Sequence, residues 1–121
     1  MAAHLKEGKG WRLGWNPDAI PFQGLVGGDA WAIEMTAGEF EDFRRLTLQL
    51  VGILQDMATE LMDEERLACE QETPNIWVEV EGYPRTYELR FILLSGRKAE
   101  GGWPATATAE LVQAIPAMTL F

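Results

Sequence analysis

The sequence predicts an α+β domain in which a long helix packs on an antiparallel sheet and a short helix follows near the C-terminus. Apolar residues alternate with polar ones before residue 36 and after residue 75, which is the period of a strand. Between these segments they recur every three or four positions, which is the period of a helix. The length of 121 residues fits one domain, 1–121.

Three strands are predicted before the helix. Residues 10–15 place two tryptophans and a leucine at alternate positions, as in a half-buried strand. Residues 22–26 and 30–36 are predicted to form two more strands, joined by the turn residues 27–29. His4, the single histidine, precedes them in an N-terminus that we expect to be frayed.

The helix is predicted to span residues 37–63. Thr36 and Glu39 have the spacing of a capping box, which marks a helix start. Glu41 and Arg45 are spaced for an ion pair along the helix. The apolar stripe that should cover the sheet consists of Phe40, Phe43, Leu46, Leu50, Ile53, Leu54, Met57 and Leu61.

The clearest hairpin joins residues 76–80 to residues 87–93. A four-residue loop, 82–85, would place Glu79 opposite Glu88 and Trp77 opposite Arg90. Such a carboxylate pair could bind a cation or share a proton, or it could lie on a solvated face relieved by a nearby arginine. Residues 96–102 are predicted to be a polar connection, and residues 109–115 a short helix closed by Pro116.

The net charge of −9 is concentrated in residues 39–72, whereas the strand segments are close to neutral. A field of this sign repels phosphate backbones and weakens non-specific binding of nucleic acid. The cluster at residues 63–65 lies where the helix dipole is unfavourable for acidic groups. Either the helix ends before Asp63 or a positive group lies nearby.

The compartment is predicted to be the cytoplasm. Cys69 is the single cysteine, so no internal disulfide can form, which suits a reducing environment. The first residues lack the apolar run of a signal peptide. The longest aliphatic or aromatic run, residues 91–94, is too short to span a bilayer, so no membrane association is expected.

The reactive side chains predict no enzyme. Ser95 is the single serine, and Cys69 lies beside two glutamates that would raise its pKa rather than activate it. No metal-ligand spacing and no glycine-rich phosphate loop is present in the sequence. We therefore expect no catalytic residue, cofactor or metal site.

Four runs of residues resemble a small cyanobacterial protein family of unknown function. They are GWRLGW (10–15), GGDAWAIE (27–34), LMDEE (61–65) and GRKAEGGW (96–103). The fold of that family is similar to the Whirly and positive-cofactor-four class of single-stranded-DNA-binding regulators. The resemblance implies strands followed by a helix, repeated once. The lysine- and glycine-containing strand motif of Whirly proteins is matched only loosely, at residues 6–10.

Aromatic and cationic residues form the candidate binding surface, because bases stack on aromatic rings beside cations. Its members are Trp11, Arg12, Trp15, Trp77, Arg90, Arg97, Lys98 and Trp103. The alternative is that the tryptophans belong to the core, since two of them share a strand face with a leucine.

The leading functional hypothesis is a non-enzymatic binding or regulatory module that acts through protein–protein contacts. The alternative is single-stranded nucleic-acid binding through the sheet face, which the net charge makes less favourable. The apolar tail 114–121 is expected to dock either on its own core or across a homodimer interface.

Overall fold

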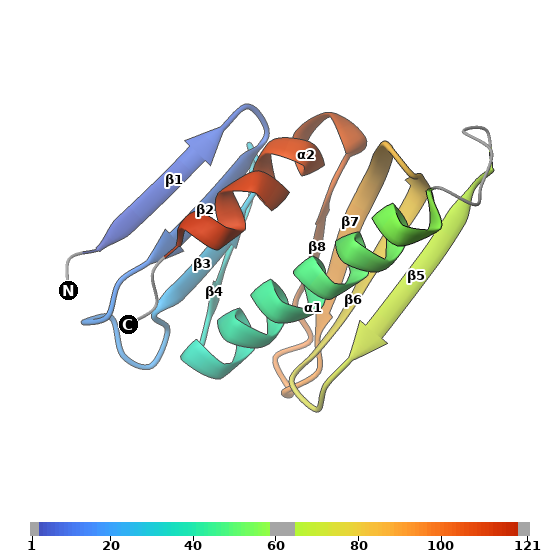
Figure 1. The fold of residues 1–121 in the computed structure, drawn as a ribbon. Coiled ribbons are helices and arrows are strands. Elements are labelled where there is room, and N and C mark those ends of the chain that lie inside the picture. The colour runs from blue at the N-terminus through green and yellow to red at the C-terminus, as the bar shows by residue number, and fades with distance from the viewer. Residues whose placement is uncertain (1–2, 59–64, 119–121) are drawn as a thin grey trace.

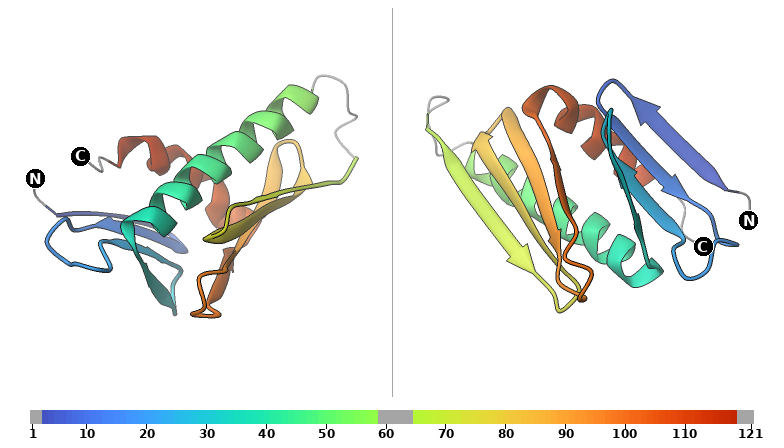
Figure 2. Two further views of the ribbon diagram at one scale, coloured as in Figure 1. Left: turned by 90° about the horizontal axis from the view of Figure 1, so that it is seen from below. Right: turned by 180° about the vertical axis from the view of Figure 1, so that it is seen from behind.

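The computed structural model describes residues 3–58 and 65–118. It contains two four-stranded antiparallel sheets, sheet A (β1 to β4) and sheet B (β5 to β8), with the strands of each in chain order (Figure 1). Both helices lie on the same side of the sheets (Figure 2). Each sheet therefore has an inner face toward the helices and an outer face that no other described element covers. The predicted α+β class and the order strands, helix, strands, helix are confirmed, although the strands form two sheets.

Sheet A contains one more strand than the sequence predicted. Its strands are β1 (His4–Gly8), β2 (Trp11–Trp15), β3 (Gly24–Gly27) and β4 (Ala32–Met35). β1 pairs with β2 across a turn in which Gly10 has a positive φ of 85°, a conformation that glycine adopts without strain. The N-terminus from His4 onward is thus ordered by strand pairing rather than frayed. Leu13 and Val26 lie opposite each other and are fully buried on the inner face.

Helix α1 (Ala37–Met57) begins as predicted. The Glu39 amide donates to Thr36 Oγ1 at 3.2 Å, and the Thr36 amide donates to Glu39 Oε1 at 2.8 Å, which completes the capping box. The end predicted at residue 63 differs, because the described helix ends at Met57. Leu61 and most of the acidic cluster at 63–65 fall outside the described residues.

The buried stripe of α1 differs from the prediction at two described positions, since Met57 is only half-buried and Ile53 is exposed. Ile53 is 39% exposed, and Val51, which the prediction omitted, is buried in its place. The expected pair between Glu41 and Arg45 is also replaced, since Arg45 reaches Asp42 at 3.3 Å instead. The buried residues of the helix are Glu39, Phe40, Phe43, Leu46, Thr47, Leu50, Val51 and Leu54.

Sheet B contains the predicted hairpin in a different register. Its strands are β5 (Leu67–Glu72), β6 (Ile76–Tyr83), β7 (Thr86–Leu93) and β8 (Glu100–Trp103), of which β5 and β8 were not predicted. Glu79 lies opposite Arg90 and not Glu88, while Glu81 lies opposite Glu88. The predicted register was wrong by two residues because Gly82, assigned to the loop, is a strand residue. Its φ of 147° suits glycine alone, so the strand continues through it.

Helix α2 (Ala105–Ala114) begins four residues earlier than predicted, because Pro104 acts as the N-cap, and it continues into a 3-10 turn, Ile115–Ala117. Arg44 of α1 donates to the carbonyl oxygens of Ile115 and Met118, each at 3.3 Å. Both residues are buried. The tail therefore docks on its own chain as far as Met118, and the remainder lies outside the described residues.

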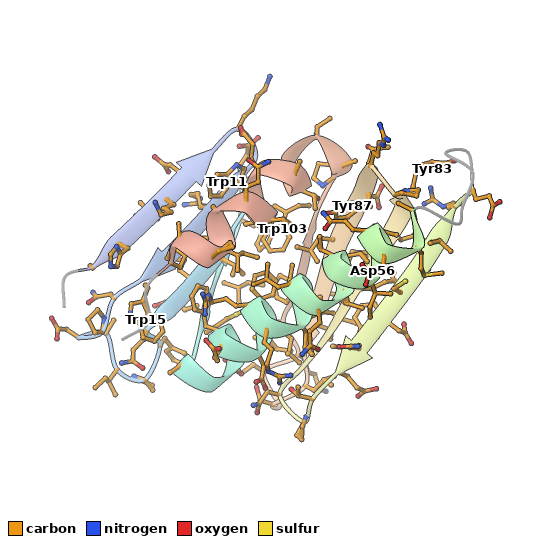
Figure 3. All side chains as sticks on the ribbon, viewed as in Figure 1. Trp11, Trp15, Asp56, Tyr83, Tyr87 and Trp103 are labelled. Atoms are coloured by element: carbon orange, nitrogen blue, oxygen red, sulfur yellow. The ribbon has the colours of Figure 1, made fainter. Side chains whose placement is uncertain are left out.

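An aromatic cluster joins the two sheets beneath the helices. Trp103 of β8 lies 5.7 Å from both Phe43 and Phe91 and 5.3 Å from Trp31, measured between ring centroids. Its indole N–H also donates to the Gly27 carbonyl of β3 at 2.8 Å. Figure 3 shows Trp103 between the sheets. Aromatic packing and one buried hydrogen bond thus fix sheet A against sheet B.

Candidate functional site

The eight candidate residues do not form one platform, because the sheets direct them to different faces. Trp11, Trp15 and Trp103 are 7%, 5% and 2% exposed and belong to the hydrophobic core, as Figure 3 shows. They lie on inner faces, where the helices cover them. These three tryptophans are therefore core residues, which was the alternative that the shared strand face suggested.

Arg12 lies on the outer face of sheet A, but its side-chain donors bond to backbone carbonyl groups. Its Nε donates to the Gly28 carbonyl at 3.1 Å, and its Nη2 donates to the Trp31 carbonyl at 2.8 Å. These bonds hold the turn between β3 and β4. Arg12 is thus a structural residue whose donors are directed into the protein.

Trp77 and Arg90 lie together on the outer face of sheet B. The Arg90 guanidinium is 5.7 Å from the Trp77 ring centroid, and its Nε donates to Glu79 Oε1 at 3.1 Å. The Trp77 indole N–H donates to Glu70 at 3.2 Å. Both residues therefore lie on the outer face, but their polar groups are paired with carboxylates.

Carboxylates dominate the outer face of sheet B. Because alternate residues of each strand share a face, the strand registers place these groups side by side. They are Glu70, Glu72, Glu79, Glu81, Glu88 and Glu100. Arg90 is the cation on the same face, and Arg66 reaches Glu81 at 3.5 Å from its edge. The strand segments after residue 73 are close to neutral in sequence, but their carboxylates, together with those of β5, gather on this outer face and make it strongly acidic.

Arg97 and Lys98 lie in the connection between β7 and β8, and they differ in role. Lys98 is exposed and has a positive φ of 55°. Arg97 donates to Glu39 Oε1 at 2.7 Å and to the Glu34 carbonyl at 2.6 Å. Its guanidinium also lies 4.7 Å from the Phe22 ring centroid. Arg97 thus ties the start of α1 to both sheets.

Glu39 is the buried charge at the centre of this network, with 3% of its surface exposed. Its carboxylate accepts hydrogen bonds from Ser95, the Thr36 amide and Arg97. Burial alone would raise the pKa of Glu39, but these hydrogen bonds and the Arg97 charge together lower it below its ordinary value. The network is fully paired and structural in character.

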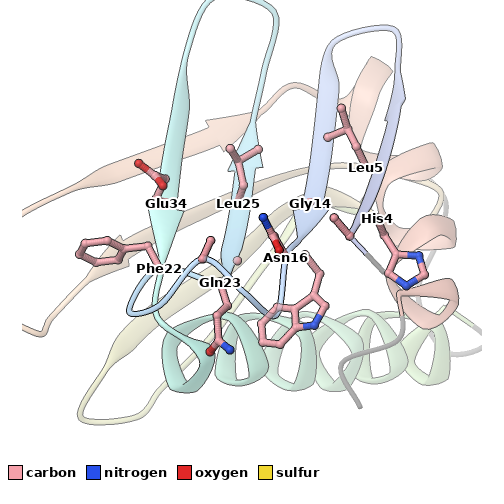
Figure 4. Close-up of a pocket in the computed structure, with 12 residues that line it drawn as sticks. His4, Leu5, Gly14, Asn16, Phe22, Gln23, Leu25 and Glu34 are labelled. Atoms are coloured by element: carbon pink, nitrogen blue, oxygen red, sulfur yellow. The ribbon is translucent and has the colours of Figure 1, made fainter. Parts of the chain in front are cut away.

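A hollow of about 340 Å³ opens on the outer side of sheet A. Figure 4 shows Leu5, Gly14, Leu25 and Glu34 in a row across its four strands. Cross-strand pairing produces this row, since Leu5 pairs with Gly14, Gly14 with Leu25, and Leu25 with Glu34. Phe22, beside Asn16 and Gln23, closes the hollow at the end of the strands.

Leu5, which lines the hollow, and Ile20, which is next in sequence to a lining residue, are highly exposed apolar side chains. Leu5 is 62% exposed, and Ile20, which follows the lining residue Ala19, is 77% exposed. They are the two most exposed large apolar residues in the described part of the chain. A concentrated apolar patch on a protein surface marks a contact site more often than scattered apolar residues do.

Gly14 provides the floor of the hollow. A Cβ at this position would lie 3.4 Å from Leu25 Cβ, which is an ordinary contact, so a side chain there would fill the hollow without disturbing the sheet. The nearby Gly24 differs, because a Cβ there would lie 2.5 Å from Phe40 Cγ on the inner face. Gly14 is itself buried, because Leu5 and Leu25 on either side already lie close to this position.

Sequence reasoning missed this site. The prediction of a frayed N-terminus leaves Leu5 outside any strand, whereas Leu5 lies in β1. The turn Lys9-Gly10, with apolar alternation on its C-terminal side, is a hairpin signal that would have identified β1.

Neither a metal-binding cluster nor a membrane-spanning helix occurs among the described residues. Within 3–58 and 65–118, His, Cys, Asp and Glu side chains form no group of three or more that could hold a metal ion. None of the helices described is both long and apolar enough to cross a membrane.

The comparisons with known proteins give a similar crystal structure and a matching family model. A crystal structure of a protein of unknown function from Prochlorococcus sp. NATL2A, described as a member of the DUF155 family, is similar in fold with a TM-score of 0.89. It shares 29% sequence identity, and the match covers 95% of this chain and 98% of that one. No curated protein matches the sequence. The model of the domain of unknown function DUF1818 matches residues 6–118, and the chain therefore belongs to that family.

Proposed function

We propose that this chain is a non-enzymatic module, located in the cytoplasm, that binds a protein partner through the outer face of sheet A. The observation that carries the proposal is the row Leu5, Gly14, Leu25, with Leu5 62% exposed on a sheet face that no other described element covers. An apolar sheet face that remains open to water is stabilised when another apolar surface covers it.

The charges of the two outer faces support the choice of sheet A. Its charged residues are Glu7, Arg12 and Glu34, and Glu7 lies directly opposite Arg12. Sheet B presents carboxylates on all four strands with Arg90 among them. A protein contact desolvates fewer unpaired charges on sheet A, so the free-energy cost of covering it is smaller.

We also propose that the fold of this chain is similar to that of the Whirly class. The resemblance implies strands followed by a helix, repeated once, and this chain has four strands before each helix, which supports the proposal. Single-stranded nucleic-acid binding, the alternative function, requires accessible aromatic rings beside free cations. Three candidate tryptophans are buried, and half-buried Trp77 with exposed Arg90 is surrounded by carboxylates. We therefore propose the Whirly-like fold but not the single-stranded nucleic-acid binding of that class.

A fluorescence titration with single-stranded oligonucleotides at low salt tests this choice. We expect no binding, because the acidic outer face of sheet B repels the phosphate backbone. Trp77 is the reporter for this face. Binding that weakens as salt rises and is lost in Arg90→Ala, a residue with an exposed side chain, would replace the protein-contact proposal with the nucleic-acid one.

A further inference from the structure

We propose that the protein partner adds an extended strand to sheet A along the free edge of β1, with alternate side chains entering the groove between β1 and α2. The inference rests on the proposed function and specifies how its partner binds. Three features of this edge carry it, namely open backbone groups, a buried indole N–H without an acceptor, and the order of charged and apolar side chains along β1.

β1 is an edge strand whose backbone is open on one side. It pairs with β2, and no other described strand lies along its opposite side (Figure 1). Gly8 and Trp11 flank the two-residue turn of the β1–β2 hairpin, and residues that flank such a turn exchange their backbone hydrogen bonds. Alternation along the ladder then directs the amide and carbonyl groups of Leu5 and Glu7 toward the free edge. A further strand would pair with these groups.

A groove of about 650 Å³ follows this edge, between β1 and the C-terminal half of α2. Lys6 and Trp11 line it on the sheet side, and Glu110 and Gln113 line it on the helix side. Successive side chains of an added strand would point to opposite faces of the sheet. Every second one would enter the groove, and the others would extend the outer face on which Leu5 is exposed.

Trp11 supplies a buried hydrogen-bond donor at the groove. Its side chain is 7% exposed, and its Nε1 has no hydrogen-bond partner in the described part of the chain. A Cβ on Gly8 would lie 2.4 Å from this nitrogen, so the N–H edge of the indole is the edge that faces β1. A buried N–H without an acceptor is unfavourable. A carboxylate or amide oxygen that enters the groove beside Gly8 would be the acceptor that Trp11 lacks.

The side chains of β1 specify the chemistry of the partner strand. Lys6 lies opposite buried Leu13 and therefore shares the inner face, whereas exposed Leu5 and Glu7 lie on the outer face. Among the described residues, Lys6 forms no ion pair. Opposite charges on directly facing residues stabilise a strand pair, and like charges oppose it. We therefore expect an acidic residue opposite Lys6, between an apolar residue opposite Leu5 and a basic residue opposite Glu7.

Amide hydrogen exchange of the purified full-length protein tests the geometry of the edge. The Leu5 and Glu7 amides should exchange about tenfold or more faster than the Lys6 and Gly8 amides, because the latter two bond to β2. The reverse order would direct Lys6 and Gly8 toward the free edge and would overturn the pairing pattern on which the inference depends.

Photo-crosslinking in living cells tests the added strand. A photoreactive amino acid replaces exposed Glu110 on the helix side of the groove and should give an adduct with a protein. Glu7→Pro removes an edge N–H without removing a hydrogen bond to β2, and proline fits an edge strand at such a position. It should reduce the adduct by about tenfold or more, because the added strand loses a backbone partner.

Glu7→Thr is the matched control, since it removes the same charge but keeps the backbone N–H. It should retain most of the adduct, and thermal unfolding of both variants confirms that the chain folds. The supporting result is the contrast between proline and threonine at position 7, because an adduct alone reports only proximity.

The outcomes separate this inference from the proposed function. No adduct from position 110, or an adduct that Glu7→Pro leaves intact, overturns the added strand. An adduct made of two copies of this chain assigns the edge to self-association and also overturns it. The proposed function fails independently, if a photoreactive residue in place of Leu25 on the outer face of sheet A gives no protein adduct.

Discussion

Leu54→Ala should lower the free energy of unfolding by about 2–5 kcal/mol. Leu54 is 1% exposed, on the face of α1 that packs against the sheets. Truncating it removes apolar contacts and leaves a cavity that close-packed neighbours cannot fill. Chemical denaturation monitored by tryptophan fluorescence measures the change.

Ile53→Ala is the matched control, since it deletes a branched aliphatic side chain from the adjacent residue of the same helix. Ile53 is 39% exposed, so its truncation should cost less than about 1 kcal/mol. Equal losses in the two variants would show that α1 is rotated relative to the sheets and that the buried stripe is assigned incorrectly.

Glu39→Gln should lower the free energy of unfolding at neutral pH by about 2–3 kcal/mol, because Arg97 loses the charge that it pairs with. The Glu39 carboxylate is buried and the Arg97 guanidinium is about one-third exposed. The energy of this ion pair should therefore lie between that of a buried pair and that of a surface pair. Arg97→Met should act in the same direction by leaving Glu39 buried without a cation.

The pH dependence of Glu39→Gln follows from the lowered pKa of Glu39 in the folded protein. A lowered folded pKa contributes stability above the unfolded pKa, roughly 4.3, and that contribution is lost as pH falls through the folded pKa. The difference in the free energy of unfolding between wild type and Glu39→Gln should therefore be largest at pH 7 and should decrease below about pH 4. Urea unfolding at a series of pH values measures it. A difference that stays constant with pH would show that the carboxylate is not the stabilising form.

Local chemistry explains which parts of the fold were predictable. The capping box of Thr36 and Glu39 involves residues three positions apart, so the helix start follows from the sequence alone. The hairpin register depends on whether Gly82 belongs to the strand or the loop, and its φ of 147° is a property of the folded backbone. β8 pairs with β7 through residues such as Gly101 and Gly102, which carry no strand signal of their own.

The candidate site was less predictable because its residues come from separate strands. Leu5, Gly14 and Leu25 meet through cross-strand pairing and form no motif along the chain. The aromatic and cationic residues stand out in the sequence by their chemical type. The inner faces of the two sheets, however, hold three of the candidate tryptophans. The alternation of Trp11, Leu13 and Trp15 already favoured a core position for the first two tryptophans, and the structure agrees.

The most direct test of the protein-contact account is photo-crosslinking in living cells. A photoreactive amino acid replaces Leu25 on the outer face of sheet A or, as the control, exposed Glu88 on the outer face of sheet B. Irradiation should yield a discrete adduct from position 25 and none from position 88, and the adduct should be destroyed by protease but not by nuclease. Adducts from position 88 alone, or an adduct that nuclease removes, would contradict the account.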